Sequence, residues 1–291
     1  MSPETKRSVI AIVIVLLIAT GLAFAGSQGG VSINGFPLFA LCVALAFIIQ
    51  WLAFIPAYLF RTEKFYDLTG GITYLTVITV ALLLSTNMDN RSLLLTGIVA
   101  IWAIRLASFL FMRIRAAGED RRFREIKQSF ARFLLTWTLQ GLWVAFSLAA
   151  ALAAITSTVR KELDAFAVIG FLVWLFGFAF EVIADSQKSA FNANAANKGK
   201  FIHTGLWAWS RHPNYFGEIV LWIGVTIIAL PILRGWQWVT LISPIFIILL
   251  LTRISGVPLL EKRADEKWGG QPDYEAYKAG TSVLVPMPPK K

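Results

Sequence analysis

Residues 133–155 read FLLTWTLQGLWVAFSLAAALAAI and contain no charged side chain. A helix needs about 20 apolar residues to cross the hydrocarbon core of a bilayer, where every backbone amide must be paired within the helix. This stretch is therefore long enough and apolar enough to form a membrane-spanning helix.

Seven other stretches have a similar character. Of the 291 residues, 57% are hydrophobic and only 15% are charged, with a mean hydropathy of +0.66. A soluble domain carries about 25% charged residues, so a water-soluble fold is excluded. We expect an all-α, polytopic membrane helix bundle, a single membrane domain over 1–291, with transmembrane helices at 8–25, 36–60, 68–85, 93–112, 133–155, 165–184, 215–233 and 238–251.

Basic residues alternate between the loops that join these stretches. Of 27 lysines and arginines, Arg91, Arg160, Lys161 and Arg234 fall in one set of alternate loops and Arg105 lies within the fourth stretch. The other 22 belong to the opposite set of loops and the termini. Because basic loops stay in the cytosol, we expect both termini there. Separately, we expect the protein to lie in the bacterial inner membrane rather than in the endoplasmic reticulum.

The net charge of +10 is spread over these short basic loops. This pattern favours membrane lipids and phosphate-bearing small molecules as partners, and it argues against nucleic acid. The sequence does not indicate an oligomeric state.

The first stretch also has features of a secretory signal peptide. Lys6 and Arg7 precede an apolar core that ends at Ala25, and cleavage there would leave seven helices. The apolar core is longer than that of a usual signal peptide, so we expect the helix to be retained.

Four ionisable residues lie inside apolar stretches: Arg105, Glu181, Asp185 and Glu218. A charge within the membrane is costly, so each of these residues is a candidate for function. Glu181 and Asp185 are four residues apart and share one helix face. Either both carboxylates face a polar cofactor, or Glu181 pairs with Arg105 while Asp185 lies at the water boundary.

The densest polar region is GKFIHTGLWAWSRHPNYFGE, residues 199–218, which holds both histidines of the chain. Pro213 suits the first position of a helix, which puts Arg211 and His212 at a helix N-terminus. Free amides and the helix dipole favour an anion such as a phosphate there.

Asn214 and Glu218 follow one turn apart, so they can offer an amide and a carboxylate to a ribose or a carboxamide. The alternative is a basic interfacial loop with an ordinary proline helix start. The chain has no glycine-rich dinucleotide motif, no Walker loop and no paired cysteines, Cys42 being its single cysteine. We therefore expect neither a Rossmann domain nor a metal site.

Three short runs resemble one known family: SRHPNYFGE at 210–218, GLW at 205–207 and ADSQK at 184–188. They are similar to the C-terminal half of the steroid 5-alpha-reductase-like membrane reductase superfamily, and more closely to its bacterial-type uncharacterised branch. The resemblance is good over about 171–286. It is weaker over 65–115.

The resemblance implies an oxidoreductase that uses NADPH to reduce a carbon–carbon double bond conjugated to a carbonyl. The substrate would be a lipid-soluble steroid-, isoprenoid- or fatty-acid-like molecule. The cofactor would lie among the helices of 133–291, in a cavity open to the cytosol, and residues 1–132 would supply the substrate side. The expected cofactor site combines residues that match the family with polar residues near them in the chain. These are Glu181, Asp185, Lys188, Lys200, Arg211, His212, Asn214, Tyr215, Glu218 and Tyr277.

The substrate side departs from the family. The steroid reductases carry an adjacent Gln-Glu pair, whereas Gln50 here is followed by Trp51, which argues against a 3-oxo steroid. Tyr66 and Asp67 are the candidate catalytic proton donors, because hydride addition builds negative charge on the substrate carbonyl. Tyr66 is alternatively an interfacial belt residue.

Two other functions stay open. The Arg-His-Pro-x-Tyr pattern at 211–215 also resembles isoprenylcysteine carboxyl methyltransferase, a membrane enzyme that uses S-adenosylmethionine. A transporter or structural membrane protein is the third possibility, in which the polar residues would line a pore or hold helices together.

Overall fold

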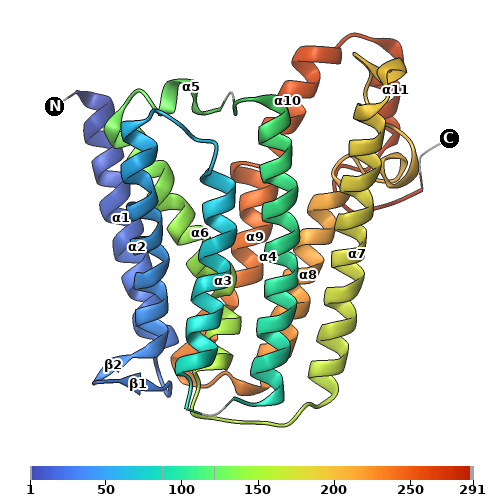
Figure 1. Ribbon diagram of the computed structural model, residues 1–291. Helices are drawn as coiled ribbons and strands as arrows, with labels where there is room; N and C mark the ends of the chain where they lie inside the picture. Colours follow the sequence, from blue (N-terminus) through green and yellow to red (C-terminus); the bar gives the residue numbers. More distant parts are fainter. Residues whose placement is uncertain (1, 87, 121, 289–291) are drawn as a thin grey trace. The chain divides into compact units, whose positions relative to one another are not determined.

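The computed structural model describes residues 2–86, 88–120 and 122–288, and nearly all of its regular structure is helical (Figure 1). Within this part of the chain, eight helices are long and apolar enough to cross a membrane. The predicted fold class is therefore confirmed, and the chain is a multi-pass integral membrane protein. The candidate spans are Pro3–Gly26, Leu38–Leu59, Tyr66–Leu84, Asn90–Ala116, Phe130–Thr156, Ala165–Ala193, Pro213–Ile232 and Gly235–Trp268.

The α-helices are α1 (Pro3–Gly26), α2 (Leu38–Leu59), α3 (Tyr66–Leu84), α4 (Asn90–Ala117), α5 (Phe123–Ile126), α6 (Phe130–Thr156), α7 (Ala165–Ala193), α8 (Pro213–Ala229), α9 (Ile242–Leu249), α10 (Val257–Trp268) and α11 (Pro272–Gly280). Short 3₁₀ turns occur at Ala195–Asn197, Gly205–Ala208, Leu230–Ile232 and Gly235–Leu241, and a π-helical turn at Leu250–Ile254.

A small β-hairpin joins α1 to α2. Strands β1 (Ser32–Ile33) and β2 (Phe36–Pro37) pair antiparallel through a two-residue turn. The turn residues Asn34 and Gly35 both have positive φ, 49° and 84°, as the hairpin turn that matches strand twist requires. Outside the helices, the described residues also form an isolated antiparallel bridge between Gly30 and Ser157.

The chain divides into two compact units. Unit 1 comprises the residues up to Ala167 and the segment Ile228–Ser243; unit 2 comprises Val168–Ile227 and the chain from Pro244 onward. Helix α6, which the sequence-based division grouped with the cofactor half, lies in unit 1.

Helix α6 forms the core of unit 1, with α1, α2 and α3 packed against it (Figure 1). Its run AAALAA, residues 149–154, is at most 3% exposed. Small side chains let helix backbones approach closely, which explains how α6 is enclosed from several sides. The Ser243 hydroxyl donates to the Ser147 carbonyl at 2.6 Å and attaches the later segment of unit 1 to this core.

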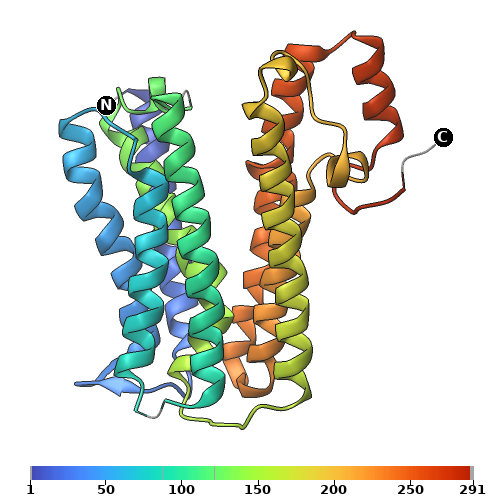
Figure 2. The ribbon, with the colours of Figure 1, turned by 45° about the vertical axis from the view of Figure 1, so that its right-hand side comes forward.

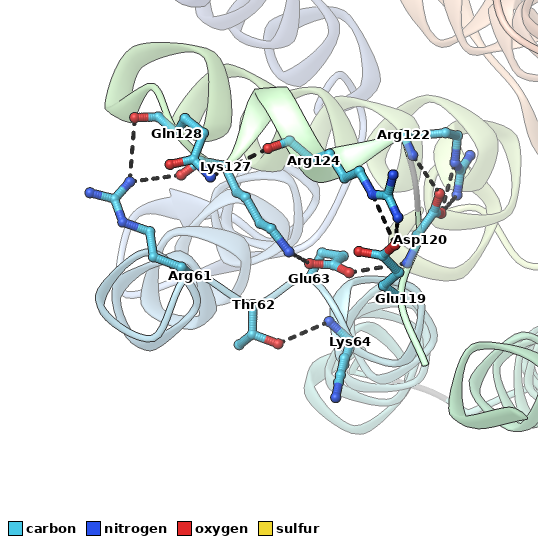
Figure 3. Close-up of polar contacts among 10 residues, drawn as sticks. All are labelled: Arg61, Thr62, Glu63, Lys64, Glu119, Asp120, Arg122, Arg124, Lys127 and Gln128. Carbon is cyan, nitrogen blue, oxygen red and sulfur yellow. Dashed lines mark hydrogen bonds and ion pairs between the residues drawn. The ribbon is translucent and has the colours of Figure 1, made fainter. Parts of the chain in front are cut away.

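A network of charged side chains joins the α2–α3 loop to the region around α5 (Figure 3). Glu63 is only 4% exposed; its carboxylate accepts hydrogen bonds from the Asp120 amide at 3.1 Å and from Lys127 Nζ at 2.7 Å. Arg61 donates to the Lys127 carbonyl at 2.7 Å. Burial alone would raise the pKa of Asp120, but its hydrogen bonds with Arg122 hold that pKa below its usual range.

Candidate functional site

Glycine residues bring α7 and α8 of unit 2 into backbone contact, and the two helices run side by side in both views (Figures 1 and 2). A Cβ atom on Gly217 would lie 2.6 Å from Glu181 N and from Gly177 O. A Cβ atom on Gly224 would meet the α7 backbone at Gly170 O, also at 2.6 Å. Any larger side chain would force the helices apart.

This close approach aligns the carboxylates of α7 with the polar groups of α8. Glu181, Asp185 and Glu218 are 2%, 6% and 7% exposed. Asn214 Nδ2 donates to Asp185 Oδ1 at 3.2 Å, whereas Asn214 Oδ1 is buried without a hydrogen-bond partner among the described residues. Burying a polar group without a partner is costly, so this amide oxygen is suited to a ligand donor.

A second group of charges lies at the start of α8. Glu261 of α10 binds two residues at once: its Oε2 is 3.0 Å from Arg211 Nη2 and its Oε1 is 2.8 Å from His212 Nε2. The His212 ring stacks on Tyr215 with centroids 5.8 Å apart. Arg211 Nε and His212 Nδ1 are buried, and neither has a partner within the described part of the chain.

We call Glu181, Asp185, Arg211, His212, Asn214, Glu218 and Glu261 the α7–α8 polar cluster. The i, i+4 spacing of its carboxylates and amide could be read from the sequence. Glu261 was missed, because its position beside Arg211 depends on where the chain after α9 folds back. Histidine, cysteine and carboxylate groups in the described residues form no set of three that could hold a metal ion.

The C-terminal segment is bound to the loop before α8. Arg211 Nη1 donates to the Lys278 carbonyl and its backbone amide to the Ser282 carbonyl, each at 2.8 Å. The Tyr277 hydroxyl donates to the Trp207 carbonyl at 2.7 Å. Burial raises the pKa of Tyr277, so its phenol stays protonated as a donor.

The two lysines expected at the site have different environments. Lys188 Nζ lies 4.3 Å from the Trp207 ring centroid, a distance typical of a cation–π contact. Trp207 is in turn fixed on α7, because its Nε1 donates to the Ala184 carbonyl at 3.0 Å. Lys200 is exposed in the loop before the 3₁₀ turn at Gly205–Ala208.

The candidate proton donors belong to unit 1. The Tyr66 hydroxyl donates to the Thr136 carbonyl at 3.0 Å, and its ring packs 4.9 Å from Phe123 and 5.1 Å from Trp137. Asp67 is half-buried in the first turn of α3. Tyr66 thus has a structural role in joining α3 to α6, and a catalytic role for either residue stays a prediction.

Fold and cluster together define a helical membrane protein with a polar site built on two closely packed helices. Comparison with protein families identifies it further: the profile of the family described as "Protein of unknown function (DUF1295)" matches residues 53–281. The chain belongs to this family. No curated protein and no solved structure matched the chain.

Proposed function

We propose that this protein is an NADPH-dependent membrane reductase that acts on a carbon–carbon double bond conjugated to a carbonyl in a lipid-soluble substrate. The observation that carries the proposal is the α7–α8 polar cluster, in which Arg211 Nε, His212 Nδ1 and Asn214 Oδ1 are buried without partners in the described structure. Buried polar atoms of this kind are rare in proteins. They are suited to a polar cofactor.

The residues of the cluster fit the parts of NADPH. Asn214 Oδ1 can accept from the amide of the nicotinamide or from a ribose hydroxyl, and the nearby carboxylates can accept from the riboses. Arg211 Nε, His212 and the lysines are donors for phosphate groups. When bound, NADPH would supply the hydride, while the chain positions it and keeps water away from the buried carboxylates.

One observation favours a second candidate, a methyltransferase that uses S-adenosylmethionine. Arg211 is already paired with Glu261 at 3.0 Å, and four carboxylates belong to the cluster. A site rich in carboxylates suits the positive sulfonium and amino groups of that cofactor better than it suits a diphosphate.

Direct binding of each cofactor to the purified protein tests the proposal. Arg211→Ala should weaken NADPH binding about tenfold, because a charge-assisted hydrogen bond is worth about 1.5 to 3 kcal/mol. The loss should shrink at high salt, which screens the wild-type site. Arg263→Ala removes an exposed arginine of α10 and is the matched control, with wild-type affinity expected.

Glu261→Gln separates the two cofactors. It removes one negative charge beside Arg211, so NADPH should bind at least as tightly as to the wild type, whereas S-adenosylmethionine should bind more weakly. If NADPH does not bind the intact protein, or if Arg211→Ala leaves NADPH affinity unchanged while S-adenosylmethionine binds tightly, the reductase proposal is wrong.

A further inference from the structure

Unit 1 has a pocket of its own where α3 begins and α4 ends. Its volume is about 290 Å³, and it is lined by Lys64, Phe65, Phe111, Ile114, Arg115 and Gly118. Lys64 lies two residues before the span Tyr66–Leu84, and Arg115 lies one residue before the end of the span Asn90–Ala116. The pocket therefore lies at the depth where lipid headgroups meet the hydrocarbon core.

The wall of this pocket carries two positive charges and no negative one. Three cations of the neighbouring network pair with carboxylates: Arg122 with Asp120, Arg124 with Glu119, and Lys127 with Glu63 (Figure 3). A fourth, Arg61, donates to the Lys127 carbonyl.

Lys64 differs from these neighbours. Its side chain extends away from Glu63 and Glu119 (Figure 3). Neither Lys64 nor Arg115 forms an ion pair with any carboxylate in the described residues. Two cations in one pocket without a counter-ion are complementary to an anion.

The remaining wall is apolar and aromatic. Phe65 and Phe111 stack with centroids 6.1 Å apart, and the Arg115 guanidinium lies 5.9 Å from the Phe111 ring centroid. Phe65 is 56% exposed and Ile114 is buried. Such a surface suits the glycerol and the first methylenes of an acyl chain. A soluble phosphate ester has no acyl chain to make the second contact. The volume of about 290 Å³ is just below the usual range for small-molecule sites, about 300 to 1,000 Å³, so a compact headgroup fits better than a dinucleotide.

We propose that this pocket, the headgroup pocket, binds the phosphate of an anionic phospholipid from the leaflet next to the α2–α3 and α4–α5 loops. Lys64 and Arg115 contact the phosphate, and Phe65 and Phe111 contact the glycerol and upper acyl chain. The inference is independent of the NADPH proposal, because it uses only residues of unit 1.

Native mass spectrometry of the purified full-length protein, with phosphatidylglycerol or phosphatidylcholine added, tests this proposal. The double variant Lys64→Ala/Arg115→Ala should lose phosphatidylglycerol affinity by about thirtyfold, given the usual contribution of about 1 kcal/mol per basic residue near an anionic surface. Phosphatidylcholine binding should not change. Lys64→Arg/Arg115→Lys keeps both charges and should retain wild-type affinity, which guards against a fold defect.

Lys6→Ala/Arg7→Ala is the matched control, because it removes the same charge from two exposed residues of α1. It should bind phosphatidylglycerol as the wild type does. An equal loss in this control, or unchanged binding in Lys64→Ala/Arg115→Ala, overturns the proposal. Glycerol phosphate tests a soluble occupant: if it binds the pocket as tightly as phosphatidylglycerol, the ligand is a free phosphate ester and not a lipid.

Discussion

Arg91 in unit 1 is buried and the side chain of Arg211 in unit 2 is 12% exposed, yet their donors are satisfied to different degrees. Arg91 is 1% exposed, and each of its three nitrogens has a partner: Nε donates to Lys161 O, Nη1 to Ile228 O, and Nη2 to Glu162 O and Asp164. Arg211 pairs through both terminal nitrogens, but its Nε has no partner among the described residues.

Buried polar atoms without partners occur in both units. Unit 1 has buried amide oxygens without partners among the described residues, those of Gln50 and Gln140. In unit 2, the Asn214 amide oxygen and His212 Nδ1 lie within three residues of Arg211, whose Nε is unpaired as well within the described part of the chain. A fully paired buried charge holds the fold, because losing one partner leaves an uncompensated charge. A cluster with unpaired donors and acceptors is incomplete by itself, and this is the physical reason for our proposal that a cofactor binds in unit 2.

The largest expected effect is on folding. Arg91→Ala should lower the free energy of unfolding by about 3 kcal/mol, as measured by denaturant unfolding in detergent. It leaves the buried Ile228 carbonyl without its donor, which costs about 1 to 3 kcal/mol, and it removes the hydrogen bonds to Glu162 O and Asp164. Arg211→Ala should lower it by less than half as much, because its partner Glu261 keeps His212 at 2.8 Å. Equal losses in both variants would mean that the cluster of unit 2 is a structural network like that of unit 1.

A smaller effect on stability is expected in the loop network. Glu63→Ala leaves Lys127 and the Asp120 amide without their acceptor and should cost about 2 kcal/mol of unfolding free energy. Glu119→Ala is the control in the same region, because its pair with Arg124 is largely exposed and such pairs contribute at most about 1 kcal/mol. Thermal unfolding of both variants gives the comparison. If Glu119→Ala lowers the unfolding temperature more than Glu63→Ala does, burial does not decide how much each ion pair contributes to stability.

In unit 2 we expect substitution of a buried polar residue to lower cofactor affinity as well as stability. Asn214→Leu removes one hydrogen bond, to Asp185, so the unfolding free energy should fall by about 1.5 kcal/mol, the low end for a hydrogen bond to a charged group. NADPH affinity should fall about tenfold, which corresponds to about 1.4 kcal/mol of binding free energy. Unfolding and cofactor titration on the same preparation measure both quantities. A large loss of stability with unchanged affinity would place Asn214 among the structural residues.

Much of the fold could be predicted from the sequence, because the bilayer imposes a minimum length on an apolar helix. The uncharged run 133–155 lies within α6, and each of the other seven stretches overlaps a span of the structure. The last stretch, 238–251, lies within the candidate span Gly235–Trp268. After the π-helical turn at Leu250–Ile254, that span continues into α10, whose sequence VPLLEKRADEKW is rich in charged residues.

Less of the candidate site could be predicted. Spacing indicated that Glu181 and Asp185 share a face of one helix, but the hydrogen bond from Asn214 to Asp185 depends on glycine packing between α7 and α8. The pairing of Glu261 with Arg211 and His212 joins residues about fifty positions apart. Contacts of this kind have no local sequence pattern, which is why Glu261 was missed while its partners were found.

The smallest expected effect is on how stability depends on pH. The titrating group is Asp164, the ion-pair partner of Arg91. Burial alone would raise the pKa of Asp164, but hydrogen bonds from Arg91, the Ala167 amide and Lys161 lower it to about 2. An unfolded aspartate has a pKa of about 3.9, so the folded state binds this proton less readily than the unfolded state does. The stabilisation is complete above about pH 4 and is lost as the pH falls toward 2.

Asp164→Asn should therefore flatten the fall in unfolding temperature between about pH 4 and pH 2, because the amide does not titrate in this range. Thermal unfolding of the wild type and the variant across these pH values is the measurement. Asp273→Asn removes an exposed carboxylate in the first turn of α11 and should keep the wild-type slope. If Asp164→Asn keeps that slope too, the carboxylate does not contribute to holding Arg91, and the backbone carbonyls of Ile228, Glu162 and Lys161 are sufficient to fix its guanidinium.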